Sequence, residues 1–172
     1  MFADYRKNSP KRRKRLTLDF VFAHPAHFLA TFMGSGLLQP ASGTWGTLAG
    51  FLVYLLLTPF FGPFFWFCLC LLCFFIGAWA CEVAAQNCGV HDHASFVIDE
   101  VFAIWFVLVC TPESFGWQLL AFAAFRVFDI VKLPPASYYD RKMRNGLGVM
   151  LDDAFAALYA IGLIRLGVWL FA

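Results

Sequence analysis

The sequence predicts an all-α bundle of membrane-spanning helices, and three observations lead to that fold class. Of the 172 residues, 61% are hydrophobic and only 14% are charged, whereas about 25% of residues are charged in an ordinary soluble domain. The 22 phenylalanines are more than a core of this size can shield from water. The apolar residues also form runs separated by short polar segments, which is the pattern of a polytopic membrane protein.

Five apolar segments are candidate membrane spans. They are residues 45–61, 63–81, 96–110, 117–131 and 149–171. Several are shorter than the ~20 residues of a full span, so we expect some helices to be tilted, incomplete or extended by polar residues. Residues 24–38 are apolar but short, which indicates an interfacial or partly inserted helix before the first span.

The distribution of basic residues predicts an orientation. Lys and Arg gather in residues 6–15 and again in residues 126–144, while the tight turns at residues 58–65 and 111–116 carry almost no charge. Basic loops face the cytoplasm, so the five spans would place the C-terminus outside. We interpret residues 1–23 as a basic cytoplasmic tail and residues 24–172 as the membrane-embedded domain.

Two other interpretations of these segments are less favoured. Basic runs also bind nucleic acid, but beside membrane spans they are better explained as cytoplasmic flanks, and we expect no nucleic-acid partner. The N-terminal residues lack the uninterrupted apolar stretch of a cleavable signal. Six cysteines lie mostly within apolar runs, where they are better explained as packing residues than as zinc ligands or disulfides.

The predicted topology brings the ionisable residues to one side of the membrane. An Asp-Glu pair opens the third span, a basic and acidic segment closes the fourth, and an Asp-Asp pair opens the fifth. The residues concerned are Asp99, Glu100, Arg126, Asp129, Lys132, Asp152 and Asp153. Ionisable groups at membrane depth are costly and usually functional. The sequence therefore predicts a single polar site at the cytoplasmic ends of the helices.

Carboxylates that converge from several helices suit Mg²⁺, which prefers oxygen ligands and keeps positions for water and phosphate. Because neighbouring residues in a helix diverge by about 100°, we expect one acid of each pair to bind metal while the other orients it or bridges to a second ion. The alternative is that these acids only complement the helix dipoles.

Arg126, Asp129 and Lys132 follow one helical face. They form either a structural ion pair or a phosphate clamp that Asp129 holds in place.

Two further segments are candidates for the same site. The glycine-rich "PASGTWGT" before the first span would bring Gly43 and Thr44 close to a phosphate, although it lacks the Lys-Ser/Thr ending of a P-loop. In "HDH", His91 and Asp92 are possible accessory residues that bind metal or relay protons. The alternative is that they are solvated loop residues.

Taken in order, four motifs resemble the phosphatidylglycerophosphatase A family. They are "GSGLLQPASGTWGTLAG", "GVHDHASFVIDE", "FRVFDIVKLPP" and "YYDRKMRNGLGVMLDDAFAAL". Three positions depart from the family pattern, because Ser42 and Leu133 replace prolines and Asn145 replaces a glycine. The resemblance implies an all-helical enzyme of the bacterial cytoplasmic (inner) membrane that dephosphorylates phosphatidylglycerol phosphate in phospholipid biosynthesis.

The resemblance also implies Mg²⁺ dependence, and the chemistry of the candidate residues then suggests a role for each. Asp99, Glu100, Asp152 and Asp153 would hold one or two Mg²⁺ ions. Arg126, Lys132, Gly43 and Thr44 would bind the substrate phosphate, and Asp129 would orient Arg126 or act as a base. Two alternatives remain: an aspartyl-phosphate intermediate, and a small ion-coupled transporter with a cation-binding acidic site. Nothing in the sequence indicates an oligomeric state.

Overall fold

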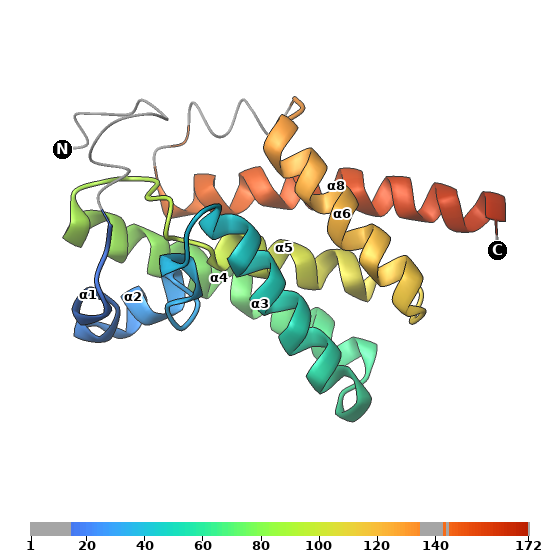
Figure 1. The fold of residues 1–172 in the computed structure, drawn as a ribbon, viewed down its shortest axis with the longest axis horizontal. Helices are drawn as coiled ribbons and strands as arrows, with labels where there is room; N and C mark the ends of the chain where they lie inside the picture. Colours follow the sequence, from blue (N-terminus) through green and yellow to red (C-terminus); the bar gives the residue numbers. More distant parts are fainter. Residues whose placement is uncertain (1–14, 135–142, 144, 172) are drawn as a thin grey trace.

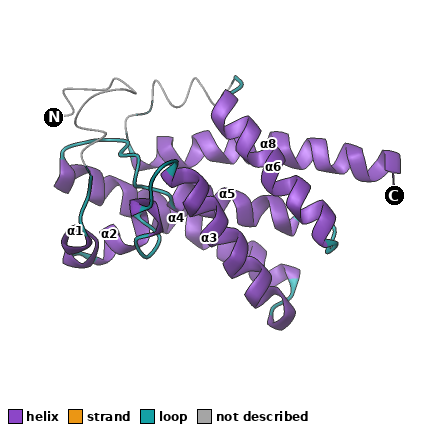
Figure 2. Ribbon diagram, viewed as in Figure 1, coloured by secondary structure: helices purple, strands orange, loops and turns teal. Residues whose placement is uncertain are grey.

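A computed structural model describes residues 15–134, 143 and 145–171. These residues form helices and no strand (Figure 2), which confirms the predicted all-α class. The α-helices are α1 (Leu18–Ala23), α2 (Pro25–Ala30), α3 (Ser42–Leu57), α4 (Pro63–Cys88), α5 (Ile98–Val109), α6 (Phe115–Val131) and α8 (Gly146–Phe171), with short 3₁₀ turns at Ser35–Leu37 and Thr58–Phe60.

Helix α5 is the central element of the bundle. It packs against α3, α4, α6 and α8 (Figure 1), and nine of its 12 residues are buried. The indole Nε1 of Trp105 donates a hydrogen bond of 2.8 Å to the carbonyl of Gly50, which ties α5 to α3. A helix buried on nearly all sides is apolar all round, and this explains the continuous hydrophobic run of α5.

Three helices are long and apolar enough to cross a membrane. These are α3 with its following 3₁₀ turn (Ser42–Phe60), α4 (Pro63–Cys88) and α8 (Gly146–Phe171). Helix α5, with 12 residues, is only about 18 Å long, against a hydrocarbon thickness of about 30 Å. Helix α6, with 17 residues, is intermediate. The count of five spans therefore stays a prediction.

The outer surface of the bundle is apolar. Phe64, Trp169 and Phe171 are each at least 80% exposed, and many further Phe and Leu side chains on α3, α4, α6 and α8 are more than half exposed. Such a surface would be unstable in water. It fits contact with lipid and agrees with the membrane class predicted from composition.

Helix α4 is longer than predicted. The sequence predicts spans at residues 63–81 and 96–110 and therefore a polar loop between them, but α4 ends only at Cys88, where Gly89 takes the left-handed conformation with φ 72°. Glycine at this position is a common helix terminator. Buried Ala84 and Ala85 lie in the extension, and Asn87 in the same stretch contacts His27 of α2. Polar residues in this stretch were therefore misread as a loop.

Helices α1 and α2 form a small unit against α4. Helix α1 falls within the predicted tail, and residues 24–38 form α2 and a 3₁₀ turn rather than one continuous helix. Buried His27 donates from Nδ1 to the carbonyl of Phe20 at 2.8 Å and accepts at Nε2 from Asn87 at 2.7 Å. This pair of bonds joins α1, α2 and the extended end of α4.

All six cysteines are free thiols. Cys70, Cys73 and Cys81 are buried in the apolar core, as expected for packing residues.

A Trp105→Phe variant is expected to unfold at a lower temperature in detergent. The change keeps most of the ring but removes the buried N–H bond to Gly50, which costs about 1–2 kcal/mol. Trp79→Phe is the matched control, because Trp79 is 47% exposed. Equal unfolding temperatures for the two variants would show that the bond between α5 and α3 contributes little to stability.

Candidate active site

A cavity of about 330 Å³ lies at one end of the bundle, where α3, α5 and α8 begin and α6 ends. Its polar lining includes every carboxylate that the sequence predicted for the site. The lining residues with ionisable side chains are His91, Asp92, His93, Asp99, Glu100, Arg126, Asp129, Lys132, Asp152 and Asp153. The predicted residues Asp99, Glu100, Arg126, Asp129, Lys132, Asp152 and Asp153 thus line one cavity, and their roles stay predictions.

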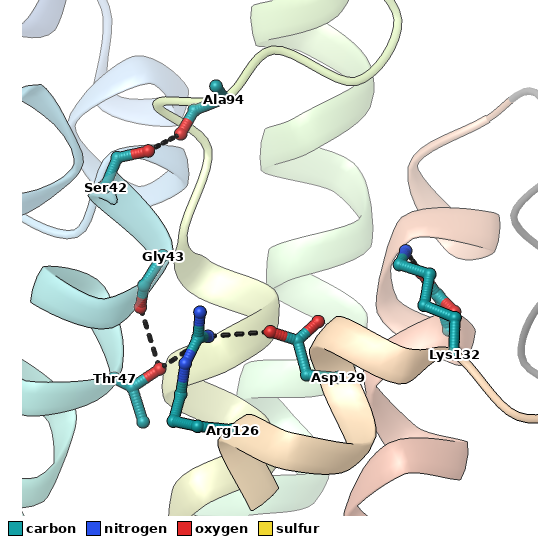
Figure 3. A network of polar contacts seen from close by, with 8 residues as sticks. Ser42, Gly43, Thr47, Ala94, Arg126, Asp129 and Lys132 are labelled. Atoms are coloured by element: carbon teal, nitrogen blue, oxygen red, sulfur yellow. Dashed lines mark hydrogen bonds and ion pairs between the residues drawn. The ribbon is translucent and has the colours of Figure 1, made fainter. Parts of the chain in front are cut away.

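The start of α3 forms one wall of the cavity. The helix begins at Ser42, three residues before the predicted start, so most of the predicted glycine-rich loop is helical. Ser42 Oγ donates to the carbonyl of Ala94 in the loop before α5 (Figure 3), and this bond fixes the two segments together. Ser42 and Gly43 line the cavity. Thr44 is half-buried on the same turn and is not among the described lining residues.

Gly43 is required for the close approach of α3 to α5. A Cβ atom at this position would lie 2.3 Å from Oε1 of Glu100 and 3.4 Å from Nη1 of Arg126. Further along α3, a Cβ at Gly46 would lie 2.4 Å from Val97, and a Cβ at Gly50 would lie 3.0 Å from Ile104. The small residues of "SGTWGTLAG" therefore let the two helices meet closely enough to place Glu100 against the first turn of α3.

Arg126 on α6 is fixed from two sides. Its Nη1 forms an ion pair of 2.7 Å with Oδ2 of Asp129 and donates to Oγ1 of Thr47 at 3.2 Å (Figure 3). Thr47 Oγ1 in turn donates to the carbonyl of Gly43 at 2.8 Å. The i, i+3 spacing predicted the contact with Asp129. The contact with Thr47 was missed.

The beginning of α8 is anchored on α4. The backbone N–H of Gly146 donates to Oε2 of Glu82 at 2.8 Å, and the N–H of Gly148 donates to the side chain of Asn145 at 2.9 Å. Gly146 also packs directly on the carbonyl of Ala78. Side-chain acceptors satisfy free N–H groups at a helix start. This anchoring sets the position of α8, and with it the two aspartates of its second turn.

Those two aspartates have different partners. Asp152 Oδ2 forms an ion pair with Nζ of Lys132, at the end of α6. Asp153 instead lies with Asp99 and Glu100, and one carboxylate oxygen from each of the three residues falls within 4.8 Å of the others. Asp99 and Asp153 are buried, and Glu100 is partly buried. We call Asp99, Glu100 and Asp153 the acidic triad.

The acidic triad is suited to a cation. Each member has one buried oxygen without a hydrogen-bond partner among the described residues: Asp99 Oδ1, Glu100 Oε2 and Asp153 Oδ2. Within the same part of the chain, the ion pairs of Arg126 and Lys132 already engage Asp129 and Asp152. Buried carboxylates without compensation are strongly unfavourable. Three convergent hard oxygen donors fit Mg²⁺, which needs few protein carboxylates.

The two acid pairs differ in how the carboxylates of neighbouring residues are directed. Asp152 and Asp153 diverge as the helical geometry predicts. Asp99 and Glu100 are also sequence neighbours, yet both offer an oxygen to the acidic triad. Glutamate has one more methylene group than aspartate, so its carboxylate can reach a point that its Cβ does not face. One acid of the Asp-Asp pair and both acids of the Asp-Glu pair therefore belong to the acidic triad, and which of them bind metal stays a prediction.

The loop between α4 and α5 closes the cavity. His91, Asp92 and His93 all line it, and both histidines are buried. The backbone N–H of Ser95 donates to Nδ1 of His93 at 3.1 Å, which holds the loop in a tight turn. His91 is therefore not the solvated loop residue that the alternative interpretation of "HDH" expected.

Two residues at the site were missed by the sequence interpretation: His93, which lines the cavity, and Thr47, which contacts Arg126. Thr47 lies one turn after Gly43 on α3, and residues four apart share a helix face. The i, i+4 spacing in "GTWGT" was therefore the available signal. It was not recognised because the helix was expected to begin at residue 45, which left Gly43 outside it.

The fold and the site define a class of protein. An apolar helical bundle carries, at one end, a cavity in which carboxylates and a fixed guanidinium face each other, an arrangement suited to a phosphate group and a divalent cation. The family described as Phosphatidylglycerophosphatase A matches residues 28–168 of the chain. The chain therefore belongs to the phosphatidylglycerophosphatase A family and is a phosphatase.

Curated relatives agree with this assignment. The chain is 45% identical over 139 residues to phosphatidylglycerophosphatase A of Haemophilus influenzae, covering 80% of this chain and 85% of the relative. It is 37% identical over 145 residues to phosphatidylglycerophosphatase A of Escherichia coli, covering 83% of each.

A third relative bears a different name. A Bacteroides thetaiotaomicron protein, provisionally named a phosphatidylinositol-3-phosphatase, is 36% identical over 152 residues, covering 82% of this chain and 92% of the relative. No solved structure was found to match the chain.

Proposed function

We propose that the protein is a Mg²⁺-dependent lipid phosphatase that hydrolyses phosphatidylglycerol phosphate to phosphatidylglycerol and phosphate. The observation that carries the proposal is the acidic triad, with an unpartnered oxygen on each member, facing Arg126 in one cavity of a phosphatidylglycerophosphatase A family chain. We place the reaction at the cytoplasmic face of a bacterial inner membrane, because α6 ends and α8 begins at the cavity, and the sequence between them is rich in Lys and Arg.

The overall reaction transfers the terminal phosphoryl group to water. The water oxygen forms a bond to phosphorus, and the bond from phosphorus to the glycerol oxygen breaks. The alcohol takes a proton, and inorganic phosphate leaves. Negative charge on the phosphoryl oxygens must be neutralised during this step.

The chain supplies that neutralisation from two directions. Asp99, Glu100 and Asp153 would hold Mg²⁺, which polarises the phosphate and lowers the pKa of bound water. Arg126, kept in place by Asp129, would bind the phosphate oxygens through its planar fork. Lys132 lines the same cavity and would add positive charge near the leaving group, with Asp152 holding its ammonium group in position.

The lipid part of the substrate requires apolar surface beside the cavity. Phe96, Ile130 and Val149 line the cavity next to the charged groups, and Ile130 is 69% exposed. Val127 and Val131 continue this exposed apolar face along α6. We propose that acyl chains remain in the lipid along α6 while the headgroup enters the cavity.

Phosphate release from purified protein in detergent tests the proposal. Phosphatidylglycerol phosphate, phosphatidate and phosphatidylinositol 3-phosphate would be compared, each with Mg²⁺ and with an excess of chelator. We expect Mg²⁺-dependent turnover with phosphatidylglycerol phosphate as the preferred substrate. Preference for phosphatidylinositol 3-phosphate would instead assign the activity named for the Bacteroides relative. Full turnover with chelator would contradict the metal assignment.

Two alternatives remain, and each has its own test. A phospho-enzyme trapped by rapid acid quench would replace direct attack by water with an aspartyl-phosphate intermediate. Absence of phosphate release from all three lipids would contradict the proposed activity and favour an ion-coupled transporter that uses the acidic triad to bind its cation.

A further inference from the structure

We propose that Thr47 is a positioning residue that sets the orientation of Arg126 toward the substrate phosphate. The inference rests on the proposed phosphatase function and deepens it, because it explains how the chain holds the phosphate-binding guanidinium in one orientation. Thr47 lies on α3 and Arg126 on α6, so the contact also joins two walls of the cavity.

The hydrogen bonds of Thr47 define its role toward Arg126. Thr47 is fully buried, and its Oγ1 donates its only proton to the carbonyl of Gly43 at 2.8 Å. Toward Nη1 of Arg126, at 3.2 Å, the hydroxyl oxygen is therefore an acceptor. The bond to Gly43 prevents rotation of the hydroxyl, so its lone pairs stay directed at Arg126.

Both anchors of Arg126 act on the same nitrogen. Nη1 contacts Thr47 Oγ1 from α3 and Asp129 Oδ2 from α6, at 3.2 and 2.7 Å. Nε is buried and has no hydrogen-bond partner among the described residues. A guanidinium is planar, so fixing one terminal nitrogen from two directions fixes its plane at the cavity that Arg126 lines. The planar group matches two phosphate oxygens in a bidentate geometry, so its orientation decides how it meets the substrate phosphate.

The local helix does not by itself require this arrangement. A buried threonine satisfies its hydroxyl by donating to the carbonyl four residues earlier. Thr111 does so with Val107, and Thr31 with His27, both at 2.8 Å. Thr47 makes the same bond but in addition accepts from Arg126. The extra contact is the feature that distinguishes Thr47, and removing the hydroxyl deletes it without changing the shape of the side chain.

Thr47→Val is the test variant, with Thr47→Ser and Thr111→Val as controls. Valine has the shape of threonine without the hydroxyl, and serine keeps the hydroxyl. Thr111→Val removes an equivalent buried bond outside the residues that line the cavity. Binding of inorganic phosphate in the presence of Mg²⁺ would be measured by calorimetry, beside kcat, KM and the thermal unfolding midpoint.

We expect Thr47→Val to weaken phosphate binding and to lower kcat/KM, each by at least about tenfold, because hydrogen bonds to charged groups contribute that much. Thr47→Ser should restore both to near the wild-type values. Thr111→Val should leave both unchanged. If Thr47→Val and Thr111→Val differ only in unfolding temperature, Thr47 has a structural role and the proposal is wrong.

An Arg126→Ala background gives a second, independent test. If Thr47 acts through Arg126, adding Thr47→Val to Arg126→Ala should cause no further loss of phosphate binding. A full additional loss would show that Thr47 acts by another route and would overturn the proposal. Phosphate binding also separates this inference from the proposed function. A wild-type protein that binds phosphate but releases none from any lipid would contradict the function alone.

Discussion

An Asp153→Asn variant is expected to lose phosphatase activity by about a thousandfold, the largest effect of any single conservative substitution in this site. Asparagine keeps the size of the side chain but removes the negative charge and one of the oxygen donors of the acidic triad. Loss of metal polarisation removes several kcal/mol of transition-state stabilisation, and about 4 kcal/mol corresponds to a thousandfold. The measurements are kcat at saturating Mg²⁺ and the Mg²⁺ concentration for half-maximal activity.

Asp152→Asn is the matched control, because the two residues are neighbours on the same turn of α8. Asp152 contacts Lys132 rather than the acidic triad. We expect a smaller loss of activity for Asp152→Asn, with little change in the Mg²⁺ requirement, since only the ion pair with Lys132 is weakened. If the two variants lost activity equally and both needed more Mg²⁺, the division of roles within the Asp-Asp pair would be wrong.

A Gly43→Ala variant is expected to remain folded but to lose activity by about a hundredfold. The added Cβ would lie 2.3 Å from Oε1 of Glu100, so this carboxylate must move. A displacement of about 1 Å at a reacting site costs on the order of a hundredfold in rate. Alanine also favours helix more than glycine does, so α3 itself should not be weakened. Activity and the thermal unfolding midpoint would both be measured.

Gly162→Ala is the control for this second variant. Gly162 also lies within a helix, α8, and a Cβ there meets no atom within 4 Å. We expect unchanged activity and a slightly higher unfolding temperature. Normal activity of Gly43→Ala would mean that Glu100 can move without loss of function, which would remove it from the proposed metal-binding set.

Much of the site could be predicted because its residues sit at helix ends. Hydrophobic runs locate helices, and connections between antiparallel helices bring alternate ends together. Asp99, Asp129 and Asp153 line one cavity for this reason. Helix boundaries were harder to predict. The polar end of α4 was read as loop because its stabilising partners, such as His27 for Asn87, are distant in sequence.

The number of membrane spans could likewise not be predicted from the local pattern of apolar residues. An apolar run of 12 residues such as α5 has the composition of a lipid-exposed helix. The structure instead surrounds α5 with α3, α4, α6 and α8. Composition does not distinguish lipid from protein as the apolar environment, because both exclude water. Length and burial make the distinction.

The sequence by itself determined the helical membrane class, the family and the grouping of acids, Arg126 and Lys132 at one end of the bundle. These follow from composition and from motifs that each lie within one short segment. Only the tertiary structure decided that Asp153 joins Asp99 and Glu100 while Asp152 pairs with Lys132, and that Thr47 holds Arg126. Those contacts depend on the rotation and approach of helices, which are set by packing between residues far apart in the chain.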